Sequence, residues 1–398
     1  MMDGHSRKLV ALGLLGVAAA LICMPSVAPF KVDGELESGD VTDIEEDGLL
    51  EDDFVYRSRS LKDTNECSLH DKPKINAPVQ DCLSRCSNHR TGCRKFFAGT
   101  PWPPSSYGDA STSCRICQTQ ENENKDFFAT LYSTKYRIPE YTAAAITRDP
   151  KSGKNNRPSD SLWNRIQPGL CSPAFHSYLR KTCKYEKTKK WGVTKVPESK
   201  CRVKTRLMKD CGDCQALHED LVGCGGIAER GHINPNKINN KNKAAQEATF
   251  SMINMAPQAP KFNRAIWKSF EHSIMKKAEE IFSNNNNVLY VITGTKIGKK
   301  DKWVNGRVLF PRFFWKAVCY TGDEGADPFG VGVYGQNNDT TKKEDMTMLR
   351  LSEFDKWLYG VNTGKHIFQG SDCEDKEGDN IEMATPNPKP KKTERGGL

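Results

Sequence analysis

The chain has 398 residues, of which 37 % are hydrophobic, so it is long enough to bury a core and is not a short peptide scaffold. The formal net charge of +9 is unevenly distributed along the sequence. Residues 1–55 hold 3 Lys/Arg against 12 Asp/Glu, which leaves 56 against 38, or a net charge of +18, for the other 343 residues. A body this positive favours a polyanion or an anionic membrane surface as its partner, because negative charge attracts it at long range.

The N-terminus has the pattern of a secretory signal. Arg7 and Lys8 precede an apolar run over residues 9–22, and Ser26-Val27-Ala28 offers small residues for cleavage. The run of 14 residues is shorter than the ~20 needed to span a bilayer. We therefore predict a signal peptide over residues 1–28 and a secreted, extracellular protein, with an uncleaved signal anchor as the alternative. No later segment is apolar enough to span a membrane, and the polar C-terminus excludes a hydrophobic anchor signal, so no stable membrane association is expected.

The next segment, residues 29–59, is acidic and has few aromatic side chains. Such a composition cannot bury enough apolar surface to fold alone. We predict that it is either a disordered tail or a pro-segment, with Arg57-Ser58-Arg59 as the processing site. A pro-segment would fold back over the basic body and mask it, whereas a solvated tail would have no regulatory role.

Fifteen cysteines occur in the chain, and one of them, Cys23, lies within the predicted signal peptide. The remaining 14 predict a disulfide framework of up to seven bridges in a secreted protein. Two C-x-x-C pairs, Cys114/Cys117 and Cys211/Cys214, raise a zinc ribbon as an alternative, which an oxidising secretory route disfavours. The sequon at Asn338 predicts surface glycosylation.

The predicted elements begin with residues 60–120, which are cysteine-dense and punctuated by prolines and therefore indicate a stapled, loop-rich outer layer. Strand-like residues follow from 127 to 146, first over 127–132 and again after Pro139. A basic insertion over residues 171–224 comes next. Its segment 180–209 holds 12 Lys/Arg against two Glu, interleaved with aromatic residues, and is either a solvated face or a surface that follows phosphates.

The second half of the chain predicts the core. Residues 248–256 alternate as a strand, and 288–293 and 313–320 read as strands of a central sheet. Between them, the apolar residues that follow Asn263 recur at helical spacing: Ile266, Trp267, Phe270, Ile274, Met275, Ala278 and Ile281. That spacing predicts an amphipathic helix. After residue 372 the chain is polar and rich in Pro and Lys, which predicts a disordered tail over residues 373–398.

Three short motifs surround this predicted helix. They are Glu229-Arg230-Gly231-His232, then Asn254-Met255-Ala256-Pro257-Gln258, and then Phe262-Asn263 with Trp267 and Glu271. Each motif alone is weak, because a single His or Asn is more often structural than catalytic. Their order, and the spacings of nine residues from Asn254 to Asn263 and eight from Asn263 to Glu271, make the set specific.

The set resembles the ββα-metal, DNA/RNA non-specific endonuclease family, with its Asp-Arg-Gly-His motif and following Asn, Asn and Glu. The positions that match are Arg230, Gly231, His232, Asn254, Gln258, Asn263, Trp267 and Glu271. Upstream segments are similar to the vertebrate endonuclease-domain-containing branch of that family: Cys93, Phe96-Phe97, Gly99-Thr100-Pro101, Ile116-Cys117-Gln118, residues 129–134 and Arg137-Ile138-Pro139. The resemblance covers residues 90–325, within a nuclease domain that we place at 60–372.

This resemblance implies an α+β fold in which a mixed β-sheet carries the ββα-metal motif on one face and is enlarged by disulfide-stapled loops. It implies that His232 is the general base, since imidazole accepts a proton near neutral pH. Asn263 would be the one direct protein ligand of a Mg²⁺ ion that keeps most of its waters, and Mn²⁺ could substitute for it.

Further roles also follow from the resemblance. Arg230 would add positive charge at the phosphate, Glu271 would orient water around the metal, and Asn254 would steady the loop of His232. Gln258 and a second arginine, Arg157, would contact the substrate. Two departures from the family pattern occur, with Glu229 in place of the usual Asp and Ala265 in place of a frequent Gly. Neither removes a group that must touch the metal or the phosphate.

The sequence therefore predicts a secreted, Mg²⁺-dependent endonuclease that hydrolyses phosphodiester bonds of DNA, and of RNA too, through phosphate contacts without sequence specificity. The alternative is a catalytically lapsed, basic nucleic-acid-binding protein. A third reading, a disulfide-rich toxin or inhibitor, would require residues 60–120 to act alone. The preference between DNA and RNA or between single and double strands, the disulfide connectivity and the oligomeric state stay open.

Overall fold

The computed structural model describes residues 67–74, 82, 84, 86, 91–107, 110–120, 125–147, 158, 165–166, 170–172, 192–195, 211–239, 243–281, 287–322, 328–371 and 373. All of these residues belong to one compact unit, which spans residues 61–398. The predicted signal peptide, the acidic segment, Arg157 and most of the basic insertion and C-terminal tail lie outside the described residues. The predictions made for those segments therefore stay predictions.

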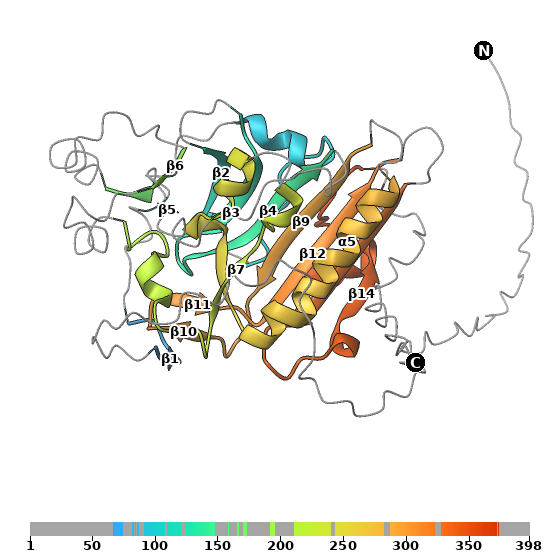
Figure 1. Ribbon diagram of the computed structural model, residues 1–398. Helices are drawn as coiled ribbons and strands as arrows, with labels where there is room; N and C mark the ends of the chain where they lie inside the picture. The colour runs from blue at the N-terminus through green and yellow to red at the C-terminus, as the bar shows by residue number, and fades with distance from the viewer. Residues whose placement is uncertain are drawn as a thin grey trace, which may run out of the picture. The chain divides into compact units, whose positions relative to one another are not determined.

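A nine-stranded mixed sheet is the centre of this unit (Figure 1). Its strand order is β14-β13-β12-β9-β4-β3-β2-β6-β5, and all neighbours are antiparallel except the parallel pair β2 and β6. In chain order the strands are β2 (Ser113–Gln120), β3 (Phe128–Ser133), β4 (Ile138–Ile146), β5 (Arg165–Ile166), β6 (Gly192–Lys195), β9 (Leu289–Lys296), β12 (Phe313–Tyr320), β13 (Phe329–Gln336) and β14 (Thr347–Arg350). The middle strands are rich in β-branched and aromatic residues and are buried on both faces.

Two smaller antiparallel sheets accompany the large one. One joins β1 (Leu69–His70), β10 (Lys302–Val304) and β11 (Val308–Phe310), and the other is the pair of β7 (Glu229–His232) and β8 (Met255–Gln258). The α-helices of the described residues are α4 (Lys243–Ala248), α5 (Lys268–Ile281) and α6 (Leu351–Tyr359), and a π-helical segment, Phe262–Trp267, leads directly into α5. No helix among the described residues combines the length and the apolar composition needed to cross a membrane.

The helices α5 and α6 cover opposite faces of the sheet. Successive side chains of β12 point to opposite faces, so neighbouring residues of this strand meet different helices. Phe314 packs under the start of α5, with its ring 5.7 Å from Trp267 and 6.0 Å from Phe262. Its neighbour Trp315 points to the other face and lies 5.6 Å from Phe354 of α6. Figure 1 shows α5 lying over β12, and Glu229 of β7 bonds to Asn263 in the helical segment that leads into α5. The predicted α+β fold, a mixed sheet that carries a ββα motif on one face, is confirmed.

Six disulfides connect cysteines of the described residues. They are Cys67–Cys224, Cys82–Cys214, Cys86–Cys114, Cys93–Cys117, Cys171–Cys211 and Cys319–Cys373. Each cysteine of the two C-x-x-C pairs is bonded to a different partner, so the zinc-ribbon alternative is wrong. Cys183 and Cys201 lie outside the described residues.

Two expectations for secondary structure were wrong in part. The strand expected over residues 248–256 begins only at Met255, because residues 252–254 form a 3-10 turn that Ser251 caps through Ile253 N. Residues 60–120 are more than a loop-rich layer, since β2 pairs with β3 inside the central sheet. The expected strands over 127–132, 288–293 and 313–320 correspond to β3, β9 and β12. The helix expected after Asn263 is present and opens as a π-helix.

Candidate active site

The hairpin of β7 and β8 brings the first two sequence motifs together. Glu229 lies opposite Gln258 in the register, and His232 lies opposite Met255. The His232 side chain is half-buried, and its ring meets the ring of Phe250 edge to face, with centroids 4.8 Å apart. The hairpin thus fixes the histidine beside an apolar wall.

Gly231 is required by the close packing of Gln258 across the hairpin. A Cβ atom at position 231 would lie 2.8 Å from Cβ of Gln258 and closer still to its amide oxygen. Any side chain there would displace Gln258 or separate the two strands. Gln258 itself is fully buried, and its predicted contact with substrate stays a prediction.

Asn254 joins the two ends of the 22-residue segment that connects β7 and β8. Its side-chain oxygen accepts a hydrogen bond from Asn234 N (2.8 Å), and its amide nitrogen donates to Asn234 O (3.0 Å) and Thr249 O (2.8 Å). Its backbone oxygen also accepts from Ile233 N (2.9 Å), directly after His232. All polar groups of this buried side chain are therefore engaged in holding the loop that follows the histidine.

A strap from the loop after β13 holds the turn between β8 and the helix. Asn337 Oδ1 accepts from Ala259 N (2.8 Å), and its Nδ2 donates to Pro257 O (3.0 Å) and Pro311 O (2.9 Å). Asp339 then accepts from Lys261 N at 2.8 Å. These contacts fix the point at which the chain enters the helical segment that carries the third motif.

Asn263 lies in the first turn of this segment and faces Glu229, the first residue of β7. Its Nδ2 donates to Glu229 Oε2 at 2.8 Å, and Arg264 forms an ion pair with the other oxygen of the same carboxylate. The carboxylate binds the NH₂ side of the amide, so the amide oxygen of Asn263 is directed away from it. The Glu that replaces the family's Asp thus reaches Asn263 from the neighbouring strand.

Glu271 lies one turn into α5 and forms an ion pair that the sequence did not predict. Its Oε1 is 3.3 Å from Nζ of Lys316, which rises from β12 and also lies 5.3 Å from the centre of the Trp267 ring. The Lys316 side chain is 2 % exposed and that of Glu271 22 %. Burial raises the pKa of the Glu271 carboxyl and lowers the pKa of Lys316, and each partner opposes the shift of the other.

Arg230 is half-buried and lies near a second histidine, His218. Burial, together with the positive charge of Arg230, lowers the pKa of His218 to about 4. His218 is therefore neutral at physiological pH. Its Nδ1 is buried and has no hydrogen-bond partner among the described residues.

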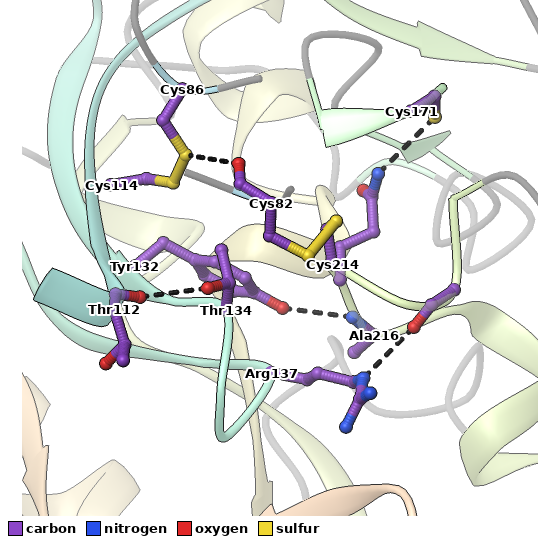
Figure 2. Close-up of a disulfide and its surroundings, with 12 residues drawn as sticks. Cys82, Cys86, Thr112, Cys114, Tyr132, Thr134, Arg137, Cys171, Cys214 and Ala216 are labelled. Carbon is purple, nitrogen blue, oxygen red and sulfur yellow. Dashed lines mark hydrogen bonds between the residues drawn. A yellow bond between two sulfur atoms is a disulfide. The ribbon is translucent and has the colours of Figure 1, made fainter. Parts of the chain in front are cut away.

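A stapled segment, residues 211–224, carries His218 and leads into β7. Three disulfides anchor it, through Cys211, Cys214 and Cys224. Figure 2 shows the Cys82–Cys214 bridge and, beside it, Tyr132 Oη accepting from Ala216 N at 2.9 Å.

Two buried arginines reinforce the stapled segment. Arg137 Nε and Arg307 Nη2 both donate to Gly212 O, at 3.0 and 2.8 Å, and Arg307 pairs with the buried Asp220. The approach to β7 is thus held rigidly from several sides.

The structure places the predicted site residues on consecutive elements of one motif. Arg230 and His232 are on β7. Asn254 directly precedes β8, and Gln258 is its last residue. Asn263 and Glu271 follow on the helical segment and α5, whereas Arg157 is outside the described residues. Sequence reasoning missed Lys316 and His218. A lysine within the apolar run Phe313–Tyr320 was a signal that could have identified Lys316, but no local pattern marked His218.

An antiparallel hairpin with a histidine on its first strand, followed by a helix with Asn263 and Glu271, is the arrangement that defines a ββα nuclease. The chain belongs to the DNA/RNA non-specific endonuclease family, which it matches over residues 110–357. This match extends beyond residue 325, where the sequence resemblance stopped, and includes β13, β14 and most of α6.

Individual relatives agree with this membership and with the vertebrate branch. The chain is 29 % identical over 277 residues to the human Endonuclease domain-containing 1 protein, covering 69 % of this chain and 48 % of that protein. The mouse protein of the same name is 27 % identical over 226 residues, with 57 % and 38 % covered. A nuclease from Nostoc sp. is 33 % identical over 107 residues, or 27 % of this chain and 37 % of that one. The chain thus spans about half, or less, of the length of these curated relatives.

Among solved structures, the chain is similar to one described as the EndoG/EndoGI complex, on the mechanism of EndoG inhibition. The identity is 16 % and the TM-score 0.37, with 62 % of this chain and 91 % of that chain covered.

Proposed function

We propose that this protein is a secreted, metal-dependent endonuclease that hydrolyses phosphodiester bonds of DNA and of RNA without sequence specificity. In this proposal His232 is the general base and Asn263 holds the divalent cation, with Mg²⁺ as the expected ion. The observation that carries the proposal is the Glu229–Asn263 contact of 2.8 Å, in which the carboxylate binds the NH₂ group of Asn263 and its amide oxygen is turned away from that carboxylate.

The residues at this position fit a hard divalent cation. Mg²⁺ prefers oxygen ligands and keeps several of its waters, so a site with few protein ligands suits it. The amide oxygen of Asn263 is the donor for direct contact, since both carboxylate oxygens of Glu229 already bind Asn263 and Arg264, and Glu271 would orient water around the ion. Among the described residues, the cysteines that would favour a softer metal are instead paired in disulfides.

A bound Mg²⁺ would supply positive charge that stabilises the transition state of phosphodiester hydrolysis. The protein's own residues would supply proton transfer, further positive charge and the orientation of water. His232, packed against Phe250, accepts the proton of the attacking water. Arg230, on the same strand, adds fixed positive charge toward the phosphate, and Glu271 orients water at the site.

Secretion and the nature of the substrate are supported by the remainder of the chain. The disulfides of the described residues are typical of an oxidising compartment. The net charge of +18 outside the first 55 residues favours a polyanionic substrate, and contacts to phosphates carry no sequence information. At the predicted glycosylation site, Asn338 Oδ1 accepts from Thr340 N at 2.9 Å in a turn whose next two residues are exposed.

The experiment that tests the proposal is a digestion panel. Double- and single-stranded DNA and RNA are each incubated with the purified chain, with Mg²⁺, with Mn²⁺ or with chelator. The proposal predicts cleavage of several substrates of unrelated sequence, lost on chelation. Salt-dependent binding to the same nucleic acids without cleavage would favour the alternative, a lapsed nucleic-acid-binding protein.

A further inference from the structure

A lysine buried in the middle of a β-strand calls for a physical explanation. Lys316 lies between Phe314 and Val318 on the face of β12 that α5 covers, and its side chain is 2 % exposed. Its Nζ is 3.3 Å from Glu271 Oε1. The ammonium group also lies over the face of the Trp267 ring, 5.3 Å from its centre.

A row of threonines lies beside this lysine across the sheet. In the register of neighbouring strands, Thr130 lies opposite Thr142, Thr142 opposite Thr293, and Thr293 opposite Lys316. Directly opposed residues point to the same face of a sheet, so the row runs under the ββα motif and ends at the lysine. All four residues are at most 1 % exposed.

Such a pair is a poor device for stability alone. Removing two charges from water costs several kcal/mol per ion, and apolar residues of similar volume often stabilise a fold as well or better. The pair does restrict geometry, because the Lys316 stem is packed in the core and the carboxylate must stay where Nζ is. Glu271, whose side chain is 22 % exposed, is thereby held in one position at the edge of the core.

We propose that Lys316 is a positioning residue that fixes the Glu271 carboxylate on the helical segment of Asn263, so that both side chains act on one bound divalent cation. The inference deepens the proposed function, on which it rests for the presence of that cation. Lys316 itself touches neither the cation nor the substrate. It acts through Glu271 alone, and this requirement makes the idea testable by a double-mutant cycle.

The test measures Mn²⁺ binding to the full chain without nucleic acid, by calorimetry or by electron paramagnetic resonance. The variants are K316M, E271Q and K316M/E271Q. The matched control is K277M, which removes a lysine from a far more exposed ion pair, with side chains 27 % and 54 % exposed, that it forms with Glu280 on the same helix. K316M should weaken Mn²⁺ binding by about 10- to 100-fold, as loss of a residue that orients a metal site does. K277M should bind within about twofold of wild type, because exposed pairs contribute little.

The decisive comparison is made in the E271Q background. If Lys316 acts through Glu271, K316M/E271Q binds Mn²⁺ as E271Q does, and its melting temperature recovers relative to K316M because no unpaired charge stays buried. Equal losses in both backgrounds, or a lower melting temperature with unchanged Mn²⁺ binding, would overturn the inference. Lys316→Gln keeps a hydrogen-bond donor, and it replaces K316M if that variant does not fold.

The inference and the proposed function can fail separately. If the variants show coupling between Lys316 and Glu271 in Mn²⁺ binding but the wild-type chain cleaves no nucleic acid, the proposed function is overturned and the positioning role stands. A chain that cleaves with Mg²⁺ but shows no coupling between Lys316 and Glu271 would overturn the positioning role only.

Discussion

Replacing Asn254 with alanine should loosen the loop that follows His232. The change removes three hydrogen bonds, of 2.8, 3.0 and 2.8 Å, and leaves the N–H and C=O of Asn234 and the C=O of Thr249 without their partner. These groups are inside the fold, since Asn234 is 2 % exposed and Thr249 0 %. With each bond contributing about 1 kcal/mol net, the loss is about 3 kcal/mol.

The assay for Asn254→Ala combines a thermal melt with plasmid digestion. A loss of about 3 kcal/mol should lower the melting temperature by about 4 to 6 °C in a chain of this size. The cleavage rate measured well below the transition should also fall, because His232 loses the support of the adjacent backbone. A variant that melts with the wild type would refute the hydrogen-bond assignment, and one that melts early but cleaves at the normal rate would refute the link to His232.

Three further predictions concern pH, metal and the stapled segment. The pKa of His218 is about 4, below the ~6.5 of an unfolded histidine, so the unfolded state gains a proton first as pH falls. Stability should therefore drop by about 2 to 3 kcal/mol from pH 6.5 to 4, and melts of His218→Gln should show a flatter profile over that window. Asn263→Ala should raise the Mg²⁺ concentration for half-maximal cleavage, and an unchanged titration would assign the ligand role elsewhere, first to Glu271. Asp220→Asn should cost about 3 kcal/mol or more in denaturant titrations, because it leaves the buried charge of Arg307 unpaired, and a neutral result would show that water reaches the pair.

Local signals were sufficient for much of the fold. The β-branched and aromatic runs that became β9 and β12, and the helical spacing after Asn263, are patterns that each segment carries alone. The short motif at β7 could also be recognised from the sequence alone. The reason for its glycine is a contact: Gln258 leaves no room for a Cβ at Gly231, and only the pairing of the two strands shows this.

Contacts between distant segments were not predictable. The strap from Asn337 to Ala259 spans 78 residues, and the pair of Lys316 and Glu271 spans 45. Neither can be seen without the register of the sheet. The disulfide pairing was open for the same reason, since many connectivities fit the same cysteines. The strand expected over 248–256 was wrong before Met255, because Ser251 caps a 3-10 turn there and the Asn254 side chain bonds to backbone carbonyls, which hydrophobic alternation does not reveal.

The most direct test of the central claim is the single-turnover cleavage rate of His232→Ala beside its affinity for the same DNA. We predict that cleavage falls by about 100-fold or more, as expected for loss of a general base. The affinity measured with chelator present should change little, because the cationic side chains that attract phosphate remain. Cleavage at a rate close to that of the wild type would contradict the assignment of His232 as the base.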